Sequence, residues 1–304
     1  KIEFIFSKNN YLARPKQKKT MPYIVITGAS TGIGRKTTEY LIERGYFVFG
    51  SVRKKEDADR LEQTFGDQFK ALIFDVRDND AIQHSADLVR QTIGEENLAG
   101  LINNAGVAIF GPLQHIPISE FETQFDINVF GILRVTQAFL PLLGADRTRT
   151  GKPGKIINIS SVSGIFTNPL LVPYCASKHA VESLTDGLRR ELLIYGIDAI
   201  SVRPGPVKTE IWPKALSADA PYMDTEYGPI LASMNKLITK TEQNAIDAAK
   251  VAALIHKILT KKRPKTKYII MRNSLPVRFI RLLPSRWVDA IFGKQMKKIL
   301  ARKR

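Results

Sequence analysis

The residues with the clearest chemical potential stand at the start of a long helical pattern. Tyr174 and Lys178 are four residues apart, so a helix that begins after Pro173 places both side chains on one face of its first turn. A free tyrosine has a pKa of about 10 and is a poor base at neutral pH. An adjacent ammonium, together with the positive charge of an oxidised nicotinamide, is expected to lower the Tyr174 pKa. The pair therefore predicts proton transfer at a substrate oxygen, although an isolated match at this spacing is common by chance.

Further polar residues follow apolar runs and suit the same chemistry. Ser161 lies 13 residues before Tyr174, just after the apolar run 156–159, and its hydroxyl can donate to a substrate carbonyl. The segment 103–106, Asn-Asn-Ala-Gly, ends another apolar run in the same way. Asn128 lies inside a helical pattern, where a polar side chain needs a partner. These residues are the candidates to complete a site around Tyr174.

A glycine-rich turn indicates a nucleotide cofactor. Residues 27–34 read Thr-Gly-Ala-Ser-Thr-Gly-Ile-Gly, directly after a strand pattern and before a helical one. Glycines at 28, 32 and 34 allow a tight turn whose backbone N–H groups approach a pyrophosphate at a helix N-terminus. The spacing differs from Gly-x-Gly-x-x-Gly, so the order of strand, turn and helix supports the prediction more than the spacing does.

The residues after the second and third strand patterns indicate the form of the cofactor. An acid after the second strand would accept from the ribose 2′-hydroxyl, whereas an arginine would pair with a 2′-phosphate. The chain has Arg53 there, followed by Lys54, with no acid before Glu56. NADP is therefore favoured over NAD, and a solvated basic turn is the alternative. Asp75 ends the third strand, where it can accept from the adenine amino group or cap the next helix.

Strand and helix patterns alternate along most of the chain. Strand patterns cover 23–27, 47–51, 71–74, 99–102, 155–159, 198–202 and 267–270. Helical patterns lie near 33–44, 56–65, 79–93, 119–143, 174–195 and 244–259. The strands are apolar throughout, as expected when helices cover both faces of a parallel sheet. The alternation predicts an α/β fold with a single Rossmann-type domain, a doubly wound parallel sheet of about seven strands and helices on both faces.

Together these segments resemble the short-chain dehydrogenase/reductase family across about residues 22–270. The family's Thr-Gly-x-x-x-Gly-x-Gly motif matches 27–34, its Asn-Asn-Ala-Gly motif matches 103–106, and its Pro-Gly-x-Val-x-Thr element matches Pro204, Gly205, Val207 and Thr209. Its four catalytic residues match Asn128, Ser161, Tyr174 and Lys178. The segments around 45–53, 103–116 and 119–143 are most similar to those of retinol and 17β-hydroxysteroid dehydrogenases.

The resemblance implies a role for each matched residue. Tyr174 is the general acid in reduction and the general base in oxidation, and Ser161, rather than its neighbour Ser160, polarises the carbonyl. Lys178 binds the nicotinamide ribose and lowers the Tyr174 pKa, while Asn128 anchors a water that relays protons to Lys178. No metal is implied. The expected cofactor residues are Thr27, Gly28, Ser30, Thr31, Gly32, Ile33, Gly34, Arg53, Asp75, Val76, Asn104, Ala105, Gly106, Tyr174, Lys178, Pro204, Gly205, Val207 and Thr209.

The charge of the chain is concentrated at its two ends. The 304 residues have a net charge of +17, with six bases and one acid over 1–20 and sixteen bases and one acid over 257–304. The intervening body is close to neutral, which argues against nucleic-acid binding over the whole surface. Residues 1–20 are expected to be a disordered extension or an artefact, 21–272 the catalytic domain, and 273–304 a basic amphipathic segment. The single cysteine, Cys175, excludes an intramolecular disulfide and is expected to pack in the interior.

The segment 206–240 is predicted to be a lid that selects the substrate. It is rich in apolar and aromatic residues, namely Trp212, Leu216, Tyr222, Met223, Ile230 and Met234, and it contains Pro206, Pro213, Pro221 and Pro229. An apolar lid over a carbonyl site favours a lipophilic substrate. The alternative, that these side chains only seal the lid onto the domain, stays open.

The C-terminal segment 275–304 has two interpretations. Apolar residues recur at helical spacing over 286–304, with Trp287 among them and seven bases on much of the remaining face. A basic amphipathic helix with a tryptophan is typical of an interfacial membrane helix. It is equally compatible with a terminal helix that docks on its own core or on a second subunit.

The sequence therefore predicts an NADP(H)-dependent oxidoreductase that interconverts a lipophilic ketone or aldehyde (steroid-, retinoid- or fatty-chain-like) and the corresponding alcohol. The alternative is a cofactor-binding sensor or scaffold that acts through its basic tail without turnover. We expect a homodimer or homotetramer in the cytoplasm, with peripheral membrane contact through 275–304 as an open question and no nucleic-acid partner. No apolar stretch reaches the length of a spanning helix.

Overall fold

The structure is a computed structural model that describes residues 21–209, 222–233, 245–280 and 282–301. The predicted extension 1–20 lies outside the described residues, and so do residues 210–221 and 234–240 of the predicted lid. Trp212, Leu216 and Met234 are among these, so their predicted contribution to the lid is not part of the description that follows.

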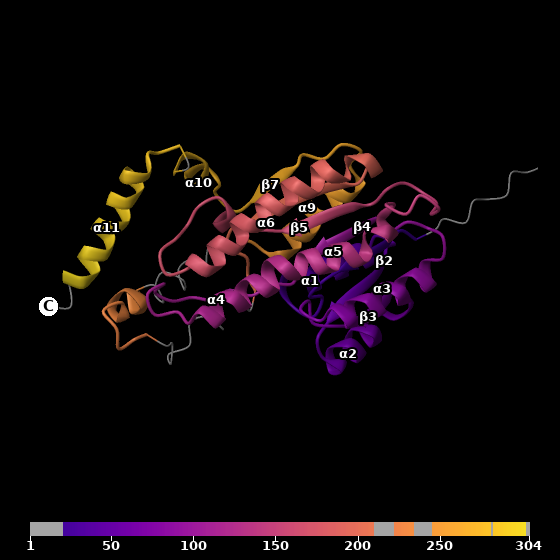
Figure 1. Ribbon diagram of the computed structural model, residues 1–304, viewed down its shortest axis with the longest axis horizontal. Coiled ribbons are helices and arrows are strands. Elements are labelled where there is room, and N and C mark those ends of the chain that lie inside the picture. Colours follow the sequence, from indigo (N-terminus) through magenta and orange to yellow (C-terminus); the bar gives the residue numbers. More distant parts are fainter. Residues whose placement is uncertain (1–20, 210–221, 234–244, 281, 302–304) are drawn as a thin grey trace, which may run out of the picture.

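Seven parallel strands form one sheet in the order β3-β2-β1-β4-β5-β6-β7 (Figure 1). The strands are β1 (Tyr23–Ile26), β2 (Phe47–Val52), β3 (Phe69–Ile73), β4 (Gly100–Asn103), β5 (Lys155–Ile159), β6 (Asp198–Pro204) and β7 (Lys267–Ile270). The chain moves outward from β1 to β3 and then returns to β4 on the other side of β1. This reversal is the hallmark of a doubly wound sheet, so the predicted single-domain Rossmann-type fold is confirmed.

Helices connect the strands and cover the two faces of the sheet (Figure 1). They are α1 (Gly32–Ile42), α2 (Lys55–Phe65), α3 (Asn79–Ile93), α4 (Ile118–Phe125), α5 (Gly131–Phe139), α6 (Val172–Glu191), α9 (Ala248–Thr260), α10 (Leu275–Ile280) and α11 (Ser285–Ala301). Short 3₁₀ helices lie at Gly66–Gln68, Pro141–Leu143, Val162–Gly164 and Leu192–Tyr195. All seven strands and all the long helices lie within a few residues of their predicted positions.

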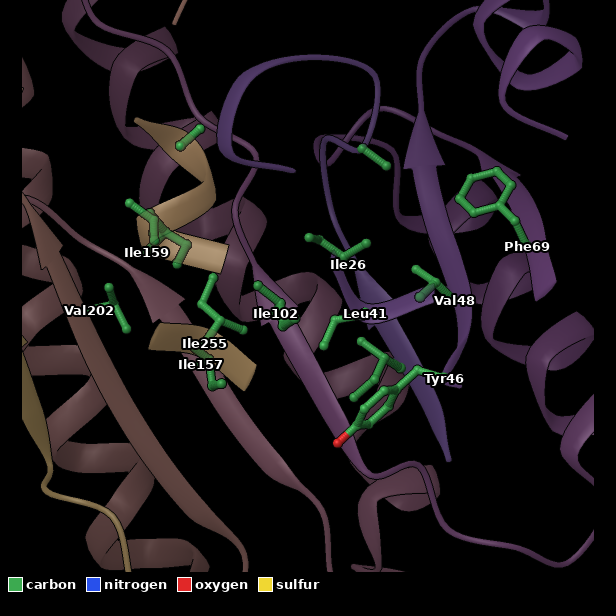
Figure 2. Close-up of a cluster of buried hydrophobic side chains, with 14 of the residues drawn as sticks. Ile26, Leu41, Tyr46, Val48, Phe69, Ile102, Ile157, Ile159, Val202 and Ile255 are labelled. Atoms are coloured by element: carbon green, nitrogen blue, oxygen red, sulfur yellow. The ribbon is translucent and has the colours of Figure 1, made fainter. Parts of the chain in front are cut away.

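Alternate residues of each strand enter two separate cores. Ile24 and Ile26 of β1 point to a core that includes Leu41 of α1 and Ile255 of α9 (Figure 2). Val25 points the other way, into a core built with α3 and α5. The strands are apolar on both faces because each face has its own helical layer, as the sequence predicted.

The predicted helix over 119–143 is interrupted. α4 ends at Phe125, a π-helical turn spans Asp126–Phe130, and α5 begins at Gly131. A π-helical turn inserts one extra residue into a helix and changes which side chains face inward. The inserted turn contains Asn128, which is fully buried. The period of the pattern alone does not reveal such an insertion.

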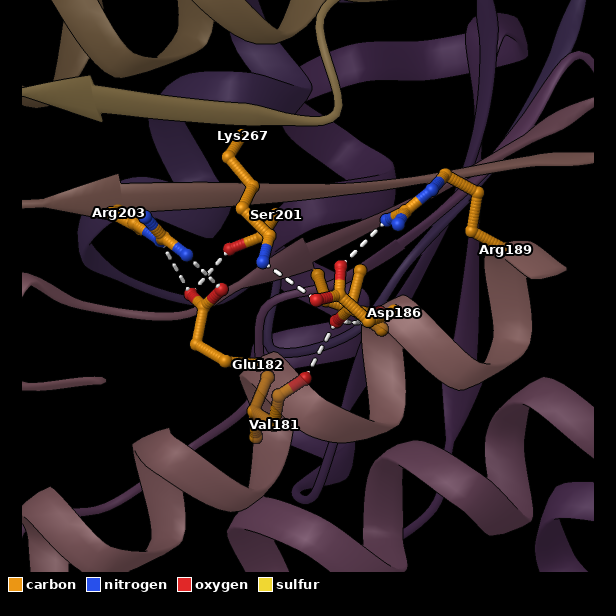
Figure 3. Close-up of polar contacts among 9 residues, drawn as sticks. Val181, Glu182, Asp186, Arg189, Ser201, Arg203 and Lys267 are labelled. Carbon is orange, nitrogen blue, oxygen red and sulfur yellow. Dashed lines mark hydrogen bonds and ion pairs between the residues drawn. The ribbon is translucent and has the colours of Figure 1, made fainter. Parts of the chain in front are cut away.

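A buried ion pair joins α6 to the end of β6 (Figure 3). Arg203 donates to both carboxylate oxygens of Glu182, with Nε 2.8 Å from Oε1, and the Ser201 hydroxyl donates to the same carboxylate at 2.5 Å. Burial raises the pKa of Glu182, but the hydrogen bonds from Arg203 and Ser201 outweigh it and hold the pKa below its ordinary value. One turn further along α6, Asp186 pairs with Arg189 and with Lys267 in a more exposed position.

Removal of Arg203 should therefore be far more costly than removal of Arg189. Arg203→Met leaves the Glu182 carboxylate buried without its counter-ion, and we expect the free energy of unfolding to fall by about 3–5 kcal/mol. Arg189→Met is the matched control, with an expected loss of about 1 kcal/mol or less, because its site is more exposed and Asp186 keeps Lys267. Urea denaturation of both variants measures the difference, and equal losses would contradict the structural role of the Glu182–Arg203 pair.

Candidate active site

One cavity of about 1130 Å³ opens at the carboxyl ends of the strands. Ligands of open α/β sheets bind at this edge, where the strand order reverses. The predicted site residues that line the cavity are Gly28, Ser30, Thr31, Gly32, Ile33, Arg53, Asp75, Val76, Asn104, Ala105, Gly106, Ser161, Tyr174, Lys178, Pro204, Gly205, Val207 and Thr209. Thr27, Gly34 and Asn128 do not line it. Their contacts show that they lie behind the wall and hold it in place.

The glycine-rich turn has the backbone that its sequence predicts. Gly28 and Gly32 have φ values of +70° and +56°, which residues other than glycine rarely adopt. A Cβ atom at Gly34 would lie 2.0 Å from the Gly28 carbonyl oxygen, so only glycine allows this close approach. α1 begins at Gly32, and its N-cap residue Thr31 makes no side-chain hydrogen bond to the first turn. The first N–H groups of α1 therefore remain available to an anion in the cavity.

The Asn-Asn-Ala-Gly segment holds this turn from the side. The Thr27 hydroxyl accepts hydrogen bonds from the backbone N–H groups of Asn104 and Ala105, both at 2.9 Å. The Asn104 amide donates to the carbonyl oxygens of Thr27 (2.9 Å) and Gly28 (3.1 Å). These contacts join the ends of β1 and β4, so the glycine turn has a fixed position relative to the rest of the cavity.

The end of the cavity at β2 and β3 carries opposite charges that are arranged differently from the prediction. Arg53 follows β2 and lines the cavity. Asp75 binds the Arg77 guanidinium through both carboxylate oxygens, each at 2.9 Å, and these hydrogen bonds lower the pKa of Asp75. The suggestion that Asp75 caps the next helix is wrong, because Asp78 is the N-cap residue of α3 and accepts from the N–H of Ala81.

Observed features of this half of the cavity fit a dinucleotide with a 2′-phosphate. The glycine turn leaves space where side chains would otherwise be, the N–H groups of α1 face that space, and a cation stands at the end of β2. Thr209 closes over the turn, with its methyl carbon 3.2 Å from where a Cβ of Gly32 would be. The chain thus offers donors for a pyrophosphate and a positive charge for a further phosphate.

Ser161, Tyr174 and Lys178 meet in the middle of the cavity. Tyr174 and Lys178 lie on the first turns of α6, and Ser161 follows β5, the strand next to β4. The Lys178 Nζ donates to the Ile159 carbonyl oxygen at 2.8 Å and lies 5.6 Å from the centroid of the Tyr174 ring. Ser161 and Tyr174 share a hydrogen bond. Three groups that can donate protons therefore converge on one small region.

Burial shifts the pKa values of the two ionisable groups in opposite directions. It raises the pKa of the half-buried Tyr174 to about 12, although the hydrogen bond with Ser161 opposes the shift. It lowers the pKa of Lys178 to about 8, against the opposing charge of Glu182. In the protein alone Lys178 does not contribute to the shift of the Tyr174 pKa, which burial raises. The phenol is therefore protonated at neutral pH and suited to donate.

Asn128 is held rigidly by backbone groups. Its Oδ1 accepts from the Val107 N–H at 2.9 Å, and its Nδ2 donates to the Val107 carbonyl oxygen at 2.9 Å and to the Ser177 hydroxyl at 3.1 Å. The Ser177 hydroxyl in turn donates to the Tyr174 carbonyl oxygen at 2.8 Å. Asn128 thus connects the loop after β4 to the turn of α6 that carries Tyr174.

Two supporting residues escaped the sequence analysis. The Ser51 hydroxyl accepts from the Gly28 N–H at 3.1 Å, which adds a tie between β2 and the glycine turn. Gln124 is fully buried and exchanges hydrogen bonds with Ile109 N–H (2.8 Å) and Val107 carbonyl oxygen (2.9 Å). A polar residue inside an apolar helical face was a usable signal for Gln124, as it was for Asn128. Ser51 had no such signal.

The far half of the cavity is mostly apolar, and the C-terminal helix forms part of its wall. The residues of α11 that line the cavity are Phe292, Gln295, Met296, Lys298 and Ile299. Other apolar lining residues are Val107, Ala108, Phe110, Leu170, Leu171 and Ile230. Of the predicted lid, Pro206 and Ile230 are among the described residues that line it. One face of the C-terminal helix thus docks on the protein, which is one of the two arrangements that its pattern allowed.

Cys175 is fully buried, as predicted, and burial raises the pKa of its thiol. Among the described residues, no group of three or more His, Cys, Asp or Glu side chains could hold a metal ion. In the same part of the chain, no helix has the length and apolar character needed to cross a membrane.

Comparison with known proteins identifies relatives along most of the chain. Residues 22–220 match the family model described as short chain dehydrogenase. The NADPH-dependent 3-dehydrocapnine reductase of Ornithobacterium rhinotracheale is 43% identical over 280 residues, which cover 92% of this chain and 99% of that protein. The 3-ketodihydrosphingosine reductase of Bacteroides thetaiotaomicron is 33% identical, with 79% of this chain and 84% of that protein covered. Retinol dehydrogenases of mouse and rat, at 31% and 32% identity, are also relatives.

Solved structures agree with this result. A short-chain dehydrogenase from Streptomyces avermitilis has a TM-score of 0.74 and 28% sequence identity, and the match covers 92% of this chain and 97% of that chain. The two proteins therefore share the arrangement of nearly the whole fold, including the strand ends that surround the cavity.

The lowered pKa of Lys178 predicts a specific dependence of stability on pH. An unfolded lysine has a pKa of about 10.4, so between about pH 8 and that value the unfolded chain binds more protons than the folded one, and stability rises with pH. From about pH 7 to about pH 9.5, we expect the free energy of unfolding of the wild type to rise by about 2 kcal/mol relative to Lys178→Met.

Urea denaturation at the two pH values gives this difference directly. Lys250→Met, on an exposed position of α9, is the control and should keep the pH dependence of the wild type. Parallel pH dependence of the wild type and Lys178→Met would show that Lys178 is not held in a charge-disfavouring environment.

Proposed function

Because the chain belongs to the short-chain dehydrogenase/reductase family, we propose that this oxidoreductase uses NADPH to reduce a lipophilic ketone to a secondary alcohol. The observation that carries the proposal is the position of Tyr174, Ser161 and Lys178 between the two halves of the cavity. One half offers donors for a dinucleotide, and the other offers apolar walls. A substrate carbonyl at their junction would lie between a reducing cofactor and a protonated phenol.

Two relatives support the direction of the reaction, and one of them also supports the cofactor. One is named an NADPH-dependent reductase of 3-dehydrocapnine, and another a reductase of 3-ketodihydrosphingosine. Arg53 supports NADPH independently, because its guanidinium can pair with a 2′-phosphate that NADH lacks.

We assign the chemistry as follows. The glycine turn at 28–34 and Arg53 would hold NADPH, which would supply the hydride for the carbonyl carbon. The Tyr174 phenol donates its proton to the carbonyl oxygen, so the ketone gains one hydride and one proton and becomes the alcohol. The Ser161 hydroxyl donates a hydrogen bond to the same oxygen and helps to stabilise the negative charge that develops there. The Lys178 ammonium stabilises the phenolate that remains until a proton returns from solvent.

The walls of the distal half support a substrate with a long apolar part. Phe110 and Leu170 come from two loops, Ile230 comes from the helical residues 228–233, and Phe292, Met296 and Ile299 come from α11. Burial of apolar surface is the main source of affinity in such a pocket, with a few polar groups to fix orientation. Gln295 and Lys298, which also line the cavity, are the polar groups of α11 available for the polar end of the substrate.

The remaining expectations on partners stay proposals. An oligomer is supported by exposed apolar side chains near the α4–α5 connection, such as Ile118 and Phe130, which are 73% and 50% exposed. Peripheral membrane contact through the C-terminal segment is developed in the next section. The alternative of a sensor or scaffold without turnover is not favoured, because the relatives named above are reductases or dehydrogenases and all four catalytic positions are intact.

The choice of cofactor depends on Arg53. Arg53→Ala should raise the Kd for NADPH by about 10- to 100-fold, because a hydrogen-bonded ion pair with a phosphate is lost, and should leave the Kd for NADH nearly unchanged. Titration with each nucleotide, followed by nicotinamide fluorescence, measures both values. Lys54→Ala is the neighbouring control, because Lys54 does not line the cavity. An equal loss for both nucleotides would rule out Arg53 as the 2′-phosphate partner.

The proton donor is tested by Tyr174→Phe. We expect kcat for reduction of 3-dehydrocapnine or 3-ketodihydrosphingosine to fall by about 10²- to 10⁴-fold, because general-acid catalysis is lost, while NADPH still binds. Tyr40→Phe, on α1 and away from the cavity lining, is the control and should keep full activity. A Tyr174→Phe variant with normal turnover would assign the proton to another group. A cellular effect that survives the loss of turnover would favour the scaffold alternative.

A further inference from the structure

α10, the connection that follows it and the first half of α11 carry many exposed apolar side chains. They are Leu275, Phe279, Leu282, Leu283, Trp287 and Ile291, which we call the outer face. Leu282 is 79% exposed, and Phe279 and Trp287 are each 64% exposed. In Figure 1 the two helices project from one end of the molecule, beyond the body of the sheet. So many exposed large apolar side chains on adjacent turns indicate a surface that is normally covered.

Positive charge surrounds the outer face. Arg286, Lys294 and Lys297 are all exposed on α11 and do not line the cavity, and Asp289 is the one acidic residue of that helix. Asp289 offsets little of this charge, since its carboxylate lies 4.0 Å from the Arg286 guanidinium, whose side chain is 95% exposed. Along α11 the apolar outer-face residues come first and the lysines follow. The partner that covers this surface must therefore be both apolar and negatively charged.

A neighbouring stripe of α11 lines the cavity. Phe292 stacks on Phe166, with ring centroids 5.9 Å apart, and Met296 and Ile299 pack against Leu170 and Ile230. Leu170 and Phe166 lie in the loop that leads into α6 and Tyr174, and Ile230 belongs to the predicted lid. α11 thus contributes side chains both to the wall of the cavity and to the outer face.

We propose that the outer face of α10 and α11 docks on the surface of an anionic lipid bilayer, and that the substrate enters the cavity from that bilayer beside α11. The first part rests only on the outer face and its charge; the second rests also on the proposed reduction of a lipophilic ketone. Apolar side chains of an interfacial helix enter the headgroup boundary while its basic residues bind anionic headgroups. A lipophilic ketone is concentrated in the same layer, so a docked enzyme has its substrate next to the cavity wall.

The charge of the outer face argues against the other occupants. A second copy of this chain in a two-fold interface would place two lysine-rich surfaces against each other. Lysine is also depleted at protein–protein interfaces. A nucleic acid would satisfy the lysines but would leave the leucines and Trp287 in water. A bilayer of anionic lipid satisfies both the apolar and the basic groups.

Co-sedimentation of the full chain with vesicles tests the dock. We expect binding to phosphatidylcholine vesicles that contain phosphatidylglycerol, weaker binding to pure phosphatidylcholine, and weaker binding at high salt. The double variant Phe279→Ser/Trp287→Ser should lose at least about tenfold in vesicle affinity. The matched control is Leu193→Ser/Ile194→Ser, whose side chains are 72% and 68% exposed outside the cavity and the outer face, and it should bind like the wild type. NADPH affinity, measured on every variant, shows that each is folded.

Two outcomes would overturn the docking of the outer face on a bilayer. Equal vesicle binding by the wild type and the Phe279/Trp287 variant removes the outer face as the docking surface. Absence of vesicle binding by the wild type, together with conversion of an oligomer to a monomer in the Phe279/Trp287 variant, would assign the outer face to a second copy of this chain. Size-exclusion chromatography with light scattering distinguishes these results.

Turnover measurements distinguish docking on a bilayer from the proposed reduction of a ketone. With 3-ketodihydrosphingosine in anionic vesicles, the Phe279/Trp287 variant should lose most of its rate, whereas in detergent micelles it should match the wild type. Equal rates of the wild type and the variant on vesicles would overturn entry from the bilayer. If the wild type binds vesicles but reduces no ketone in either form, the dock stands and the proposed function fails.

Discussion

A charged lysine held in a nearly dry environment beside a phenol is the constraint on which the rest of this structure depends. Lys178 is 5% exposed, and its Nζ donates to a backbone carbonyl oxygen, that of Ile159. Burial of an ammonium is unfavourable, so the position persists only if the surrounding elements cannot move away from it. Glu182, one turn further along α6, supplies a negative charge nearby and is itself fixed by Arg203 and Ser201 of β6.

A second set of buried polar contacts fixes the same elements from the other side. The Asn103 amide donates to Thr136 of α5 and to Asn158 of β5, and the Asn158 amide donates to Thr185 of α6. All four side chains are at most 2% exposed, so these bonds have little competition from water. They join β4, β5, α5 and α6, the elements that lead to Ala105 and Ser161 and carry Tyr174. These buried contacts therefore form a rigid base under the cavity. The loops above them form the apolar half of the cavity.

Much of this arrangement could be predicted because it depends on local patterns. A four-residue spacing puts Tyr174 and Lys178 on one helical face, a positive φ requires the glycines at 28 and 32, and the alternation of apolar runs with helices gives the order of layers. The π-helical turn at Asn128 and the pairing of Asp75 with Arg77 could not, because both depend on contacts made only in the folded chain. The role of α11 was half predicted. Its period shows two faces, but only packing shows that Phe292 and Met296 are the face turned to the cavity.

The same apolar surroundings that suit a lipophilic substrate also set the protonation state of the acid. Tyr174 and Lys178 stand where the polar half of the cavity meets the apolar half, and in both cases burial disfavours the charged form. For the phenol this means retention of the proton, and for the lysine it means a charge that is less stable than in water. A bound cofactor with phosphates favours the charged form of Lys178. A ketone that excludes water disfavours the charged form of Tyr174. A phenolate formed by proton donation then has an ammonium beside it, at a distance where low polarity strengthens their attraction.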